Sequence, residues 1–234
     1  MIRKKLRHTC GKNKKTVSNW VGKLKNVPCF LVGCGPSLED HPMRLIDGLF
    51  SIGINSSYKK IDPTILMWQD MEFWYQVKRD LRNIQALKYC RDVSDPSGTH
   101  YHFILNNETF HHTKNPMVLF GRGNTGALSF ELAYVLGCNP IVLLGFDCQY
   151  RGRKTDFFGI NNFHKPHTLR MCSNGLKWIH QNHERGRVKV INCSDNNIFK
   201  EKYTLKEAVD MVKDDYEYTG RDIFLSQMFG PGCK

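Results

Sequence analysis

The sequence predicts an α/β protein with three layers: a mostly parallel sheet covered by helices on both faces. Short apolar runs end in glycines or small polar residues, which is typical of buried parallel strands. Segments with helical spacing alternate with these runs, and the connections are short. A chain of 234 residues with 41% hydrophobic and 12% aromatic residues is long enough for one well-buried core.

The order of the expected elements supports this fold. We expect strands at residues 27–32, 49–54, 65–68, 101–105, 140–144 and 188–191. We expect helices around residues 38–46, 72–87, 125–136, 170–183 and 205–212. Helix 125–136 carries small and apolar side chains all round, so it should be packed between other elements. Apart from strand 101–105, residues 91–115 are polar, and residues 150–168 form a long polar loop.

The positive charge is concentrated at the N-terminus. The net charge is +12, and residues 1–26 hold nine basic and no acidic side chains, whereas the remainder holds 25 basic and 22 acidic ones. We therefore expect a basic arm at residues 1–26, a ligand-binding α/β domain at residues 27–195 and a helical extension at residues 196–234. Such an arm is either a solvated leader or a nonspecific contact for nucleic acid or an anionic membrane.

Cysteine spacing and hydropathy bear on the compartment. The nine cysteines are dispersed and form no C-x-x-C pair, which favours free thiols in a reducing environment. No stretch approaches the roughly 18 apolar residues of a membrane span, and the N-terminus lacks the apolar core of a signal peptide. We expect a cytoplasmic protein, either free or peripheral to the inner membrane face.

The segment FLVGCGPSLED places Gly33, Cys34, Gly35, Pro36 and Ser37 directly after the first expected strand. Ligands of open parallel sheets bind beyond the carboxyl ends of the strands. Glycines allow close approach of the backbone, and N–H groups at a helix start attract anions. The segment lacks the third glycine of a dinucleotide fingerprint and the lysine of a P-loop. A tight turn without a ligand is the alternative interpretation.

Other expected strand ends carry polar groups as well. Asn55 follows the second strand, Asp70 follows the third, and Thr125 and Gly126 begin the packed helix. Because the carboxyl ends of parallel strands lie at one edge, these groups are expected to converge on one nucleotide site. Asp147 follows the strand at 140–144; it either accepts backbone N–H groups in its own turn, which is favoured, or holds a divalent ion.

These motifs resemble a known superfamily when they are taken in order. G-x-G-P-S-L, the Asn after strand two, the Thr-Gly helix start and LGCNPIVLLGFD are similar to the Rossmann-like superfamily that joins bacterial lipooligosaccharide sialyltransferases to archaeal 6-hydroxymethylpterin pyrophosphokinase-like proteins. The resemblance covers roughly residues 27–195, is closest to the sialyltransferases, and extends to phage-type members. It implies a Rossmann-like, GT-A-like fold and glycosyl transfer from a nucleotide-sugar donor.

The resemblance also implies roles for individual residues. Gly33 to Ser37 would form the nucleotide turn. Asn55 and Asp70 would face the sugar or base, and Thr125 and Gly126 would lie near the ribose or donor. Cys34 replaces the usual Asn of the family, and Asp70 stands where Asn is expected. Because an acidic Asp70 would repel an anionic sialic acid, a neutral sugar donor fits at least as well.

Catalytic roles are implied for the polar loop and the helix that follows it. His167 precedes Leu176 by nine residues, as the general base of the family precedes its helix Leu, and His164 is the alternative or supporting base. A neutral imidazole can take the proton of an acceptor hydroxyl. The family uses tyrosines in this loop to stabilise the departing phosphate; Tyr150 is the one available here, and Arg151, Arg153 or Lys154 could do the same through its charge. The reaction implied is a direct displacement.

No obligatory metal is expected. His164-x-x-His167 near Cys172, or the pair His111-His112, lacks the second ligand pair of a zinc site. Mg²⁺ stays possible as a companion of a bound nucleotide.

Three classes of function follow from these observations. The first is a glycosyltransferase that uses a nucleotide sugar and a saccharide or modified nucleic-acid acceptor. The second is a pyrophosphokinase or other nucleotide-phosphate transferase that uses ATP with Mg²⁺. The third is a phage DNA-modifying transferase or a nucleic-acid-binding module guided by the basic arm.

Overall fold

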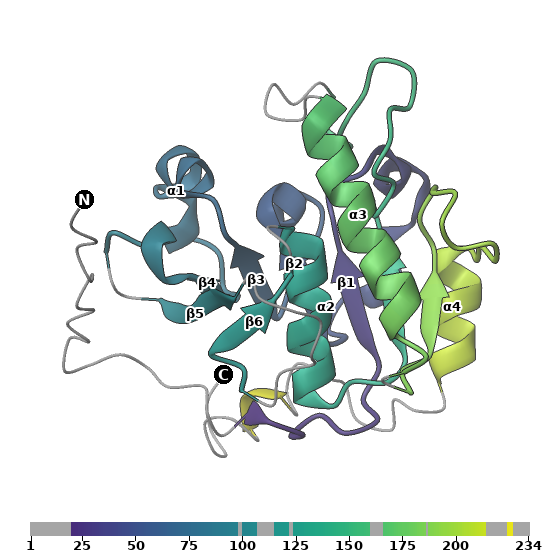
Figure 1. Ribbon diagram of the computed structural model, residues 1–234, viewed down its shortest axis with the longest axis horizontal. Coiled ribbons are helices and arrows are strands. Elements are labelled where there is room, and N and C mark those ends of the chain that lie inside the picture. Colours follow the sequence, from purple (N-terminus) through teal and green to yellow (C-terminus); the bar gives the residue numbers. More distant parts are fainter. Residues whose placement is uncertain are drawn as a thin grey trace, which may run out of the picture.

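A computed structural model describes residues 20–97, 100–106, 115–121, 124–159, 166–185, 187–213 and 224–226. It contains one eight-stranded sheet in the order β6-β5-β4-β3-β2-β1-β7-β8, and every neighbouring pair is parallel. Helices cover both faces of this sheet (Figure 1). The predicted three-layer, Rossmann-like α/β fold is confirmed.

The strands are β1 (Cys29–Val32), β2 (Ser51–Ile54), β3 (Ile65–Trp68), β4 (Leu87–Arg91), β5 (Tyr101–Asn106), β6 (Val118–Phe120), β7 (Ile141–Leu144) and β8 (Val190–Asn192). The α-helices are α1 (Met71–Val77), α2 (Thr125–Leu136), α3 (Pro166–Asn182) and α4 (Leu205–Val212). Short 3-10 helices are η2 (Pro36–Asp40), η3 (Met43–Ile46), η4 (Asn55–Lys59), η5 (Asp80–Arg82) and η6 (Asp92–Ser94).

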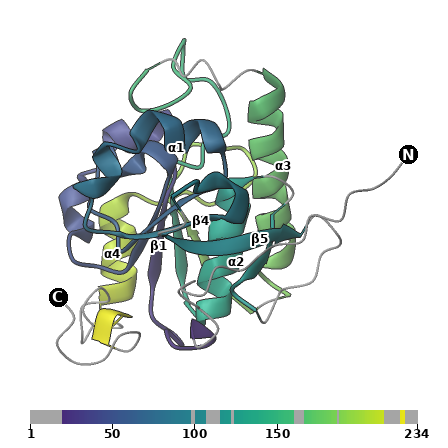
Figure 2. The same cartoon turned by 90° about the vertical axis from the view of Figure 1, so that its left-hand side faces the viewer.

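Helices α2 and α3 lie side by side on one face of the sheet, and α1 and α4 lie on the other (Figures 1 and 2). Strand β1 shows why both faces need a cover. Cys29 and Leu31 belong to the core cluster that includes α2, whereas Phe30 and Val32 belong to the cluster that includes α4. Successive side chains of a strand point to opposite faces, so an all-apolar strand is stable only between two layers.

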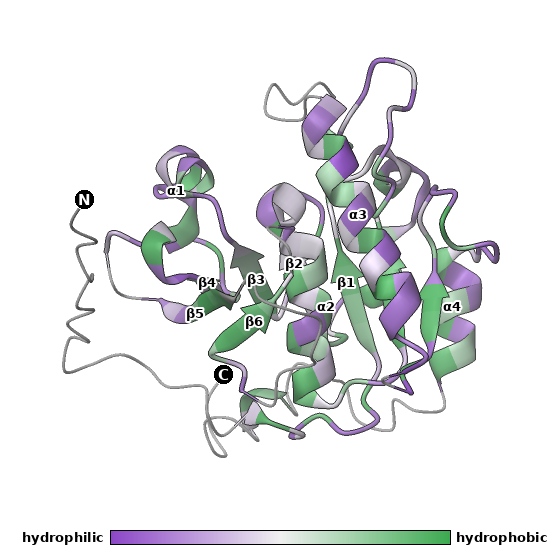
Figure 3. Ribbon diagram, in the orientation of Figure 1, coloured by the Kyte–Doolittle hydropathy of each residue, from purple (hydrophilic) through white to green (hydrophobic). Residues whose placement is uncertain are grey.

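The hydropathy of the residues agrees with a sheet that is buried between two layers of helices (Figure 3). Strands β1 and β8 are hydrophobic, and α3 carries hydrophilic residues along the side turned away from the sheet. Among the residues that the structure describes, no helix is both long enough and apolar enough to cross a membrane. All seven cysteines in this part of the chain are free thiols.

Several predicted elements agree with the structure residue for residue. These are the strand at 65–68 and the helices at 125–136 and 205–212. The predicted helix at 72–87 is too long, because α1 ends at Val77 and β4 begins at Leu87. The predicted helix around 38–46 is two 3-10 helices, because Pro42 interrupts it. The helix predicted at 170–183 begins earlier, at Pro166.

Some predictions fall on residues outside the described part of the chain. These are His164, the pair His111-His112, residues 1–19 of the predicted basic arm, and most of residues 214–234. Within the described part, Trp20, Leu24 and Phe224 are buried in the core cluster that includes α2.

The strand order creates one break in direction. From β1 the chain moves outward through β2 to β6, and then α2 carries it back to β7 on the other side of β1. The strand order therefore reverses between β1 and β7. In open parallel sheets, ligands bind at such a switch point, beyond the carboxyl ends of the strands.

Candidate functional site

A cavity of about 220 Å³ lies at this switch point and is called the central cavity here. It is lined by residues from the carboxyl ends of β1, β2, β3 and β7 and from the N-terminal parts of α2 and α3. Of the residues predicted to bind a nucleotide, it brings together Gly33, Cys34, Gly35, Asn55, Asp70, Thr125 and Gly126. Segments distant in sequence thus form one concave site.

A second cavity of about 320 Å³, the side cavity, adjoins the first. The two share Cys34, Asn55, Asp70, Asp156 and Thr168 in their walls. Lys59, Glu72 and Phe158 line only the side cavity, and the Lys59 ammonium lies 5.3 Å from the centre of the Phe158 ring. Two substrates could therefore lie next to each other across a shared wall.

The glycines of the turn are required by packing. A Cβ on Gly33 would lie 2.5 Å from the carbonyl oxygen of Gly145. A Cβ on Gly35 would lie 2.5 Å from Oδ2 of Asp147 and 2.7 Å from the same Gly145 oxygen. The ends of β1 and β7 therefore approach too closely for any other residue, whether or not a ligand is bound.

Asp147 stabilises this turn through hydrogen bonds. Its carboxylate accepts hydrogen bonds from the Ser37 N–H at 2.7 Å, the Ser37 hydroxyl at 2.6 Å and the Asp195 N–H at 3.0 Å. Burial raises the pKa of Asp147, although these hydrogen bonds act in the opposite direction. Pro36, Ser37 and Asp147 do not line either cavity. Asp147 accepts backbone N–H groups of Ser37 and Asp195, which is the role that the sequence favoured for it.

Asn55 has the geometry of a ligand-binding residue. It follows β2 with φ of 49°, in the left-handed region that non-glycine residues rarely adopt. Its buried Oδ1 atom has no hydrogen-bond partner among the described residues, although Asn55 lines both cavities. Strained backbone and unsatisfied polar atoms concentrate at functional sites in native proteins.

Asp156 is a cavity residue that the sequence analysis did not select. It is 1% exposed, it lines both cavities, and it lies in the loop after β7. The neighbouring Phe157 N–H donates to the carbonyl oxygen of Cys34 at 2.9 Å, which fixes Asp156 beside the glycine turn. The signal in the sequence was the aromatic pair Phe157-Phe158 in an otherwise polar loop, which indicates a packed segment but does not single out Asp156.

The loop residues that were selected lie farther out. Tyr150 is 47% exposed and Arg153 is exposed, and neither lines a cavity. Their neighbours Arg151 and Lys154 form ion pairs with Asp40 and Glu39, at 2.5 and 2.7 Å. These pairs connect the loop to η2, directly after the glycine turn.

His167 lies in the first turn of α3 with an exposed side chain. Its Nε2 atom is 3.4 Å from the hydroxyl of Thr168, and Thr168 lines both cavities. His167 itself does not line either cavity, so it is placed beside them.

The charge of the central cavity is negative. Asp70 and Asp156 line it, and among the described residues no Lys or Arg does. Burial, together with these two carboxylates, raises the pKa of Cys172 to about 11. Burial also raises the pKa of Cys34. Both thiols are therefore protonated near neutral pH, and neither is an activated nucleophile.

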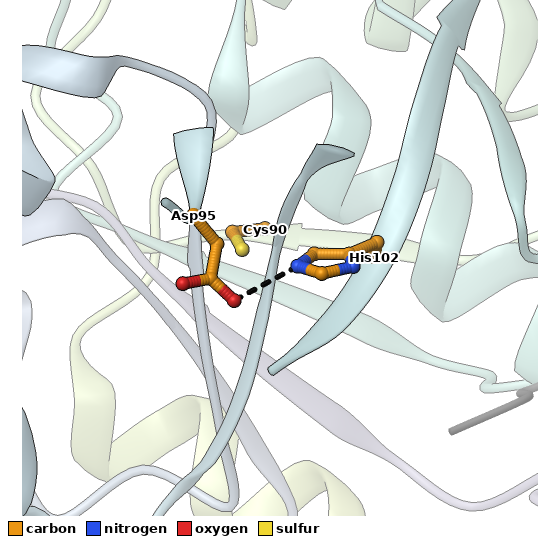
Figure 4. Close-up of side chains that lie close together, drawn as sticks. All are labelled: Cys90, Asp95 and His102. Atoms are coloured by element: carbon orange, nitrogen blue, oxygen red, sulfur yellow. Dashed lines mark hydrogen bonds and ion pairs between the residues drawn. The ribbon is translucent and has the colours of Figure 1, made fainter. Parts of the chain in front are cut away.

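Cys90, Asp95 and His102 form a buried cluster at the β4–β5 connection (Figure 4). Their possible ligand atoms lie within 4.8 Å of one another. Oδ2 of Asp95 is 2.9 Å from His102 Nε2 and accepts from the His100 N–H, while Oδ1 accepts from the Ser97 N–H and hydroxyl. Both carboxylate oxygens thus already have partners, and the cluster is explained as a structural hydrogen-bond network.

Replacing Asp95 by asparagine is expected to lower the free energy of unfolding at pH 7 by about 1–3 kcal/mol. Burial raises the pKa of Asp95, but hydrogen bonds from His102, Ser97 and His100 outweigh it and leave the pKa well below its ordinary value. The stabilisation is therefore full above the unfolded-state pKa of about 3.9 and is lost as the pH falls below it.

Urea unfolding between pH 7 and pH 3 measures this effect. The free energy of unfolding should fall with decreasing pH more steeply in the wild type than in the Asp95→Asn variant. Asp92→Asn is the control, since among the described residues the Asp92 carboxylate accepts a hydrogen bond only from the adjacent Val93 N–H. Equal pH dependence in wild type and Asp95→Asn would contradict the assignment.

The fold and the cavity define a class: an open parallel α/β protein with a ligand site at its topological switch point. Over 87% of its length the chain is similar to the MAf glycosyltransferase from Magnetospirillum magneticum AMB-1, with a TM-score of 0.55 and 18% identity. The chain spans 39% of that protein. At this identity the likeness concerns the fold.

Two structures of the sialyltransferase CstII from Campylobacter jejuni are more distant. The complex with CMP-3FNeuAc has a TM-score of 0.41 and 15% identity, over 71% of this chain and 80% of that one. The complex with cytidine-5'-monophosphate has 0.45 and 16%, over 81% and 98%. These TM-scores are below the level that implies a shared fold. No family model and no curated protein matches the sequence.

Proposed function

We propose that the protein is a glycosyltransferase that moves a sugar from a nucleotide-sugar donor to a hydroxyl acceptor. The observation that carries this proposal is the pair of adjoining cavities at the switch point, with Asn55, Asp70 and Asp156 in their shared wall. Transfer requires donor and acceptor to be held next to each other in a fixed orientation. The similarity of the fold to the MAf glycosyltransferase is consistent with this assignment.

In this proposal the central cavity, at about 220 Å³, holds part of the donor, and the rest of the nucleotide sugar extends out of it. The backbone at Gly33 and Gly35 and the N–H groups at the start of α2 face the nucleotide phosphate, because helix N-termini attract anions. The side chain of Asn55 faces the base or ribose. The carboxylates of Asp70 and Asp156 accept hydrogen bonds from sugar hydroxyls, and a neutral donor sugar fits this negative cavity at least as well as a carboxylated one.

The acceptor occupies the side cavity, and His167 is the proposed base. His167 lines neither cavity, so it must turn toward the side cavity, which its neighbour Thr168 lines. It then removes the proton of the acceptor hydroxyl, and the acceptor oxygen forms a bond to the anomeric carbon of the sugar. The bond from that carbon to the phosphate oxygen breaks, and the nucleotide leaves with the electron pair. Tyr150 and Arg153 are exposed. We therefore propose that they contact the leaving phosphate only when the loop after β7 moves them toward the central cavity.

A second candidate, a nucleotide-phosphate transferase, is favoured by one observation. Asp70 and Asp156 offer carboxylate oxygens at the same cavity, and Mg²⁺ bound with ATP prefers such ligands. Stabilisation of the protein by ATP with Mg²⁺, and by no nucleotide sugar, would favour this candidate.

Asn55→Gly tests the proposed donor site. Glycine tolerates a φ of 49° at no steric cost, so the melting temperature should stay equal or rise. The ligand contact of the amide is lost, so the affinity for nucleotide sugars should fall at least tenfold. The measurement is a thermal-shift screen of nucleotide sugars and ATP with Mg²⁺, followed by calorimetry with the nucleotide sugar that stabilises the protein most.

Asn26→Gly is the matched control. Asn26 has a similar φ of 62° but lines neither cavity. It should give the same change in melting temperature and leave affinity unchanged. Unchanged affinity in Asn55→Gly would remove Asn55 from the site, and a wild-type protein that binds no nucleotide sugar would overturn the proposal itself.

A further inference from the structure

A third cavity, of about 850 Å³, lies away from the switch point and is called the basic pocket here. It lies between the end of α1, η5 and the starts of β4 and β5. Its charged lining residues are Lys78, Arg79, Arg82 and Lys88, with His100 beside them, and none of its described lining residues is acidic. It shares no lining residue with the central or side cavity.

The positive charge of the basic pocket is not neutralised within the described chain. Lys78, Arg79 and Arg82 are exposed, and no ion pair to a carboxylate is found for them among the described residues. Asp80, which lies between them in sequence, accepts a hydrogen bond from the Tyr58 hydroxyl at 3.1 Å. Basic residues at a helix C-terminus are common on solvated faces, but here they surround a hollow.

Lys88 adds an observation that surface lysines do not provide. It is half-buried at the start of β4, and its ammonium donates to the carbonyl oxygen of Ile84. Burial lowers the pKa of Lys88, while the charge of Asp62 acts in the opposite direction and offsets part of this effect. A partly desolvated cation costs free energy unless an anion lies close to it. An anion in the pocket would therefore relieve a cost that the protein otherwise carries.

The size and the aromatic residues of the pocket narrow the class of ligand. Its volume falls in the range of about 300–1,000 Å³ that is common for small-molecule sites. The Lys78 ammonium lies 5.4 Å from the centre of the ring of Trp74, which lines the pocket, and 5.6 Å from the ring of Tyr75, which lies outside the lining. These rings already contact a cation, so they are poor platforms for the base stacking of a single-stranded nucleic acid.

We propose that the basic pocket binds a small anion carrying several phosphate groups, held by Arg79, Arg82 and Lys88. Guanidinium groups bind phosphate oxygens in a bidentate manner, and several adjacent cations select for multiple negative charges. The site is independent of the proposed glycosyl transfer, because its lining residues are different.

The test is calorimetry of the full chain with inorganic tripolyphosphate at low and high salt. The wild type should bind, with affinity that falls as salt rises. Arg79→Ala/Arg82→Ala should weaken binding at least tenfold, and both side chains are exposed, so the fold should tolerate the change. The matched control Lys206→Ala/Lys213→Ala removes two exposed cations outside the pocket and should bind as the wild type does. Lys88→Met is a further variant that should also weaken binding.

Three outcomes would overturn the proposal: no binding by the wild type, equal binding by Arg79→Ala/Arg82→Ala, or binding of a short oligothymidylate but not of tripolyphosphate. The last outcome would assign the pocket to nucleic acid. Asn55→Gly separates this site from the donor site, since it should leave tripolyphosphate binding unchanged. Failure of one proposal is therefore distinguishable from failure of the other.

Discussion

Gly35→Ala is expected to lower the free energy of unfolding by about 3 kcal/mol or more, the upper end of what overpacking costs. The new Cβ would lie 2.5 Å from Oδ2 and 2.6 Å from Cγ of Asp147, and 2.7 Å from the carbonyl oxygen of Gly145. These neighbours cannot move freely. The Gly145 oxygen accepts the Gly35 N–H at 2.9 Å, and the Asp147 carboxylate is held by Ser37 and Asp195.

Urea unfolding of Gly35→Ala and Gly152→Ala measures this effect. Gly152 has φ of 61° and no atom within 4 Å of a built Cβ, so alanine there meets backbone strain without a clash, at about 1 kcal/mol. Asp147→Ala in the Gly35→Ala background should not restore the stability, because the Gly145 oxygen remains and Ser37 and Asp195 lose the carboxylate that accepts their hydrogen bonds. If Gly35→Ala lowers the free energy of unfolding no more than Gly152→Ala does, the ends of β1 and β7 do not approach each other as closely as described.

His167→Ala is expected to reduce transfer, and slow hydrolysis of the donor, by about 100-fold or more, as loss of a general base does. Donor affinity should stay within about twofold, because His167 does not line the central cavity. Initial rates with the nucleotide sugar found in the screen, combined with calorimetric affinities, separate these two effects.

Two further variants test whether His167 or His164 is the base. His180 is exposed on the same helix, so His180→Ala controls for changes in α3 and should react at the wild-type rate. His164→Ala tests the alternative base. A full rate in His167→Ala would remove His167 as the base, and loss of the rate in His164→Ala alone would assign the role to His164.

The parts of the fold that could be predicted are those buried on both faces. Strands β1, β3 and β7 are uninterrupted apolar runs, and α2 has small and apolar residues around its circumference apart from Ser129 and Glu131, so composition indicated them. Strand β4 was missed because Lys88 and Arg91 lie within it, partly exposed, and make the segment look like part of a polar loop. Strand β6 has only three residues, too few for a period to be recognised.

The candidate site also contains residues that could be predicted and residues that could not. Asn55, Asp70 and Thr125 could be brought together from sequence because each follows a strand or begins a helix, and the sheet fixes where such positions meet. Asp156 could not, because it lies in an irregular loop whose path is set by tertiary contacts such as the Phe157–Cys34 hydrogen bond. The proposed roles of His167, Tyr150 and Arg153 rest on family resemblance and spacing, and they stay predictions.

The glycine turn had a structural cause that the sequence alone did not reveal. Gly33 and Gly35 were predicted either to let the backbone approach a ligand or to form a tight turn without one, and the structure adds that the end of β7 requires them. Both reasons can hold at once, since the same backbone lines the central cavity. Substitution of either glycine would therefore not by itself reveal a ligand contact.

Ser37 and Asp147 hydrogen-bond to each other, and neither lines a cavity, whereas Asn55 and Asp70 line both. Mutations at Asn55 and Asp70 would therefore leave the Ser37–Asp147 bond of the glycine turn in place. Donor preference could therefore change through single substitutions at these two positions of the cavity wall, each of which leaves this bond in place. Relatives with this architecture should differ first at the residues of the cavity wall and last at Ser37 and Asp147.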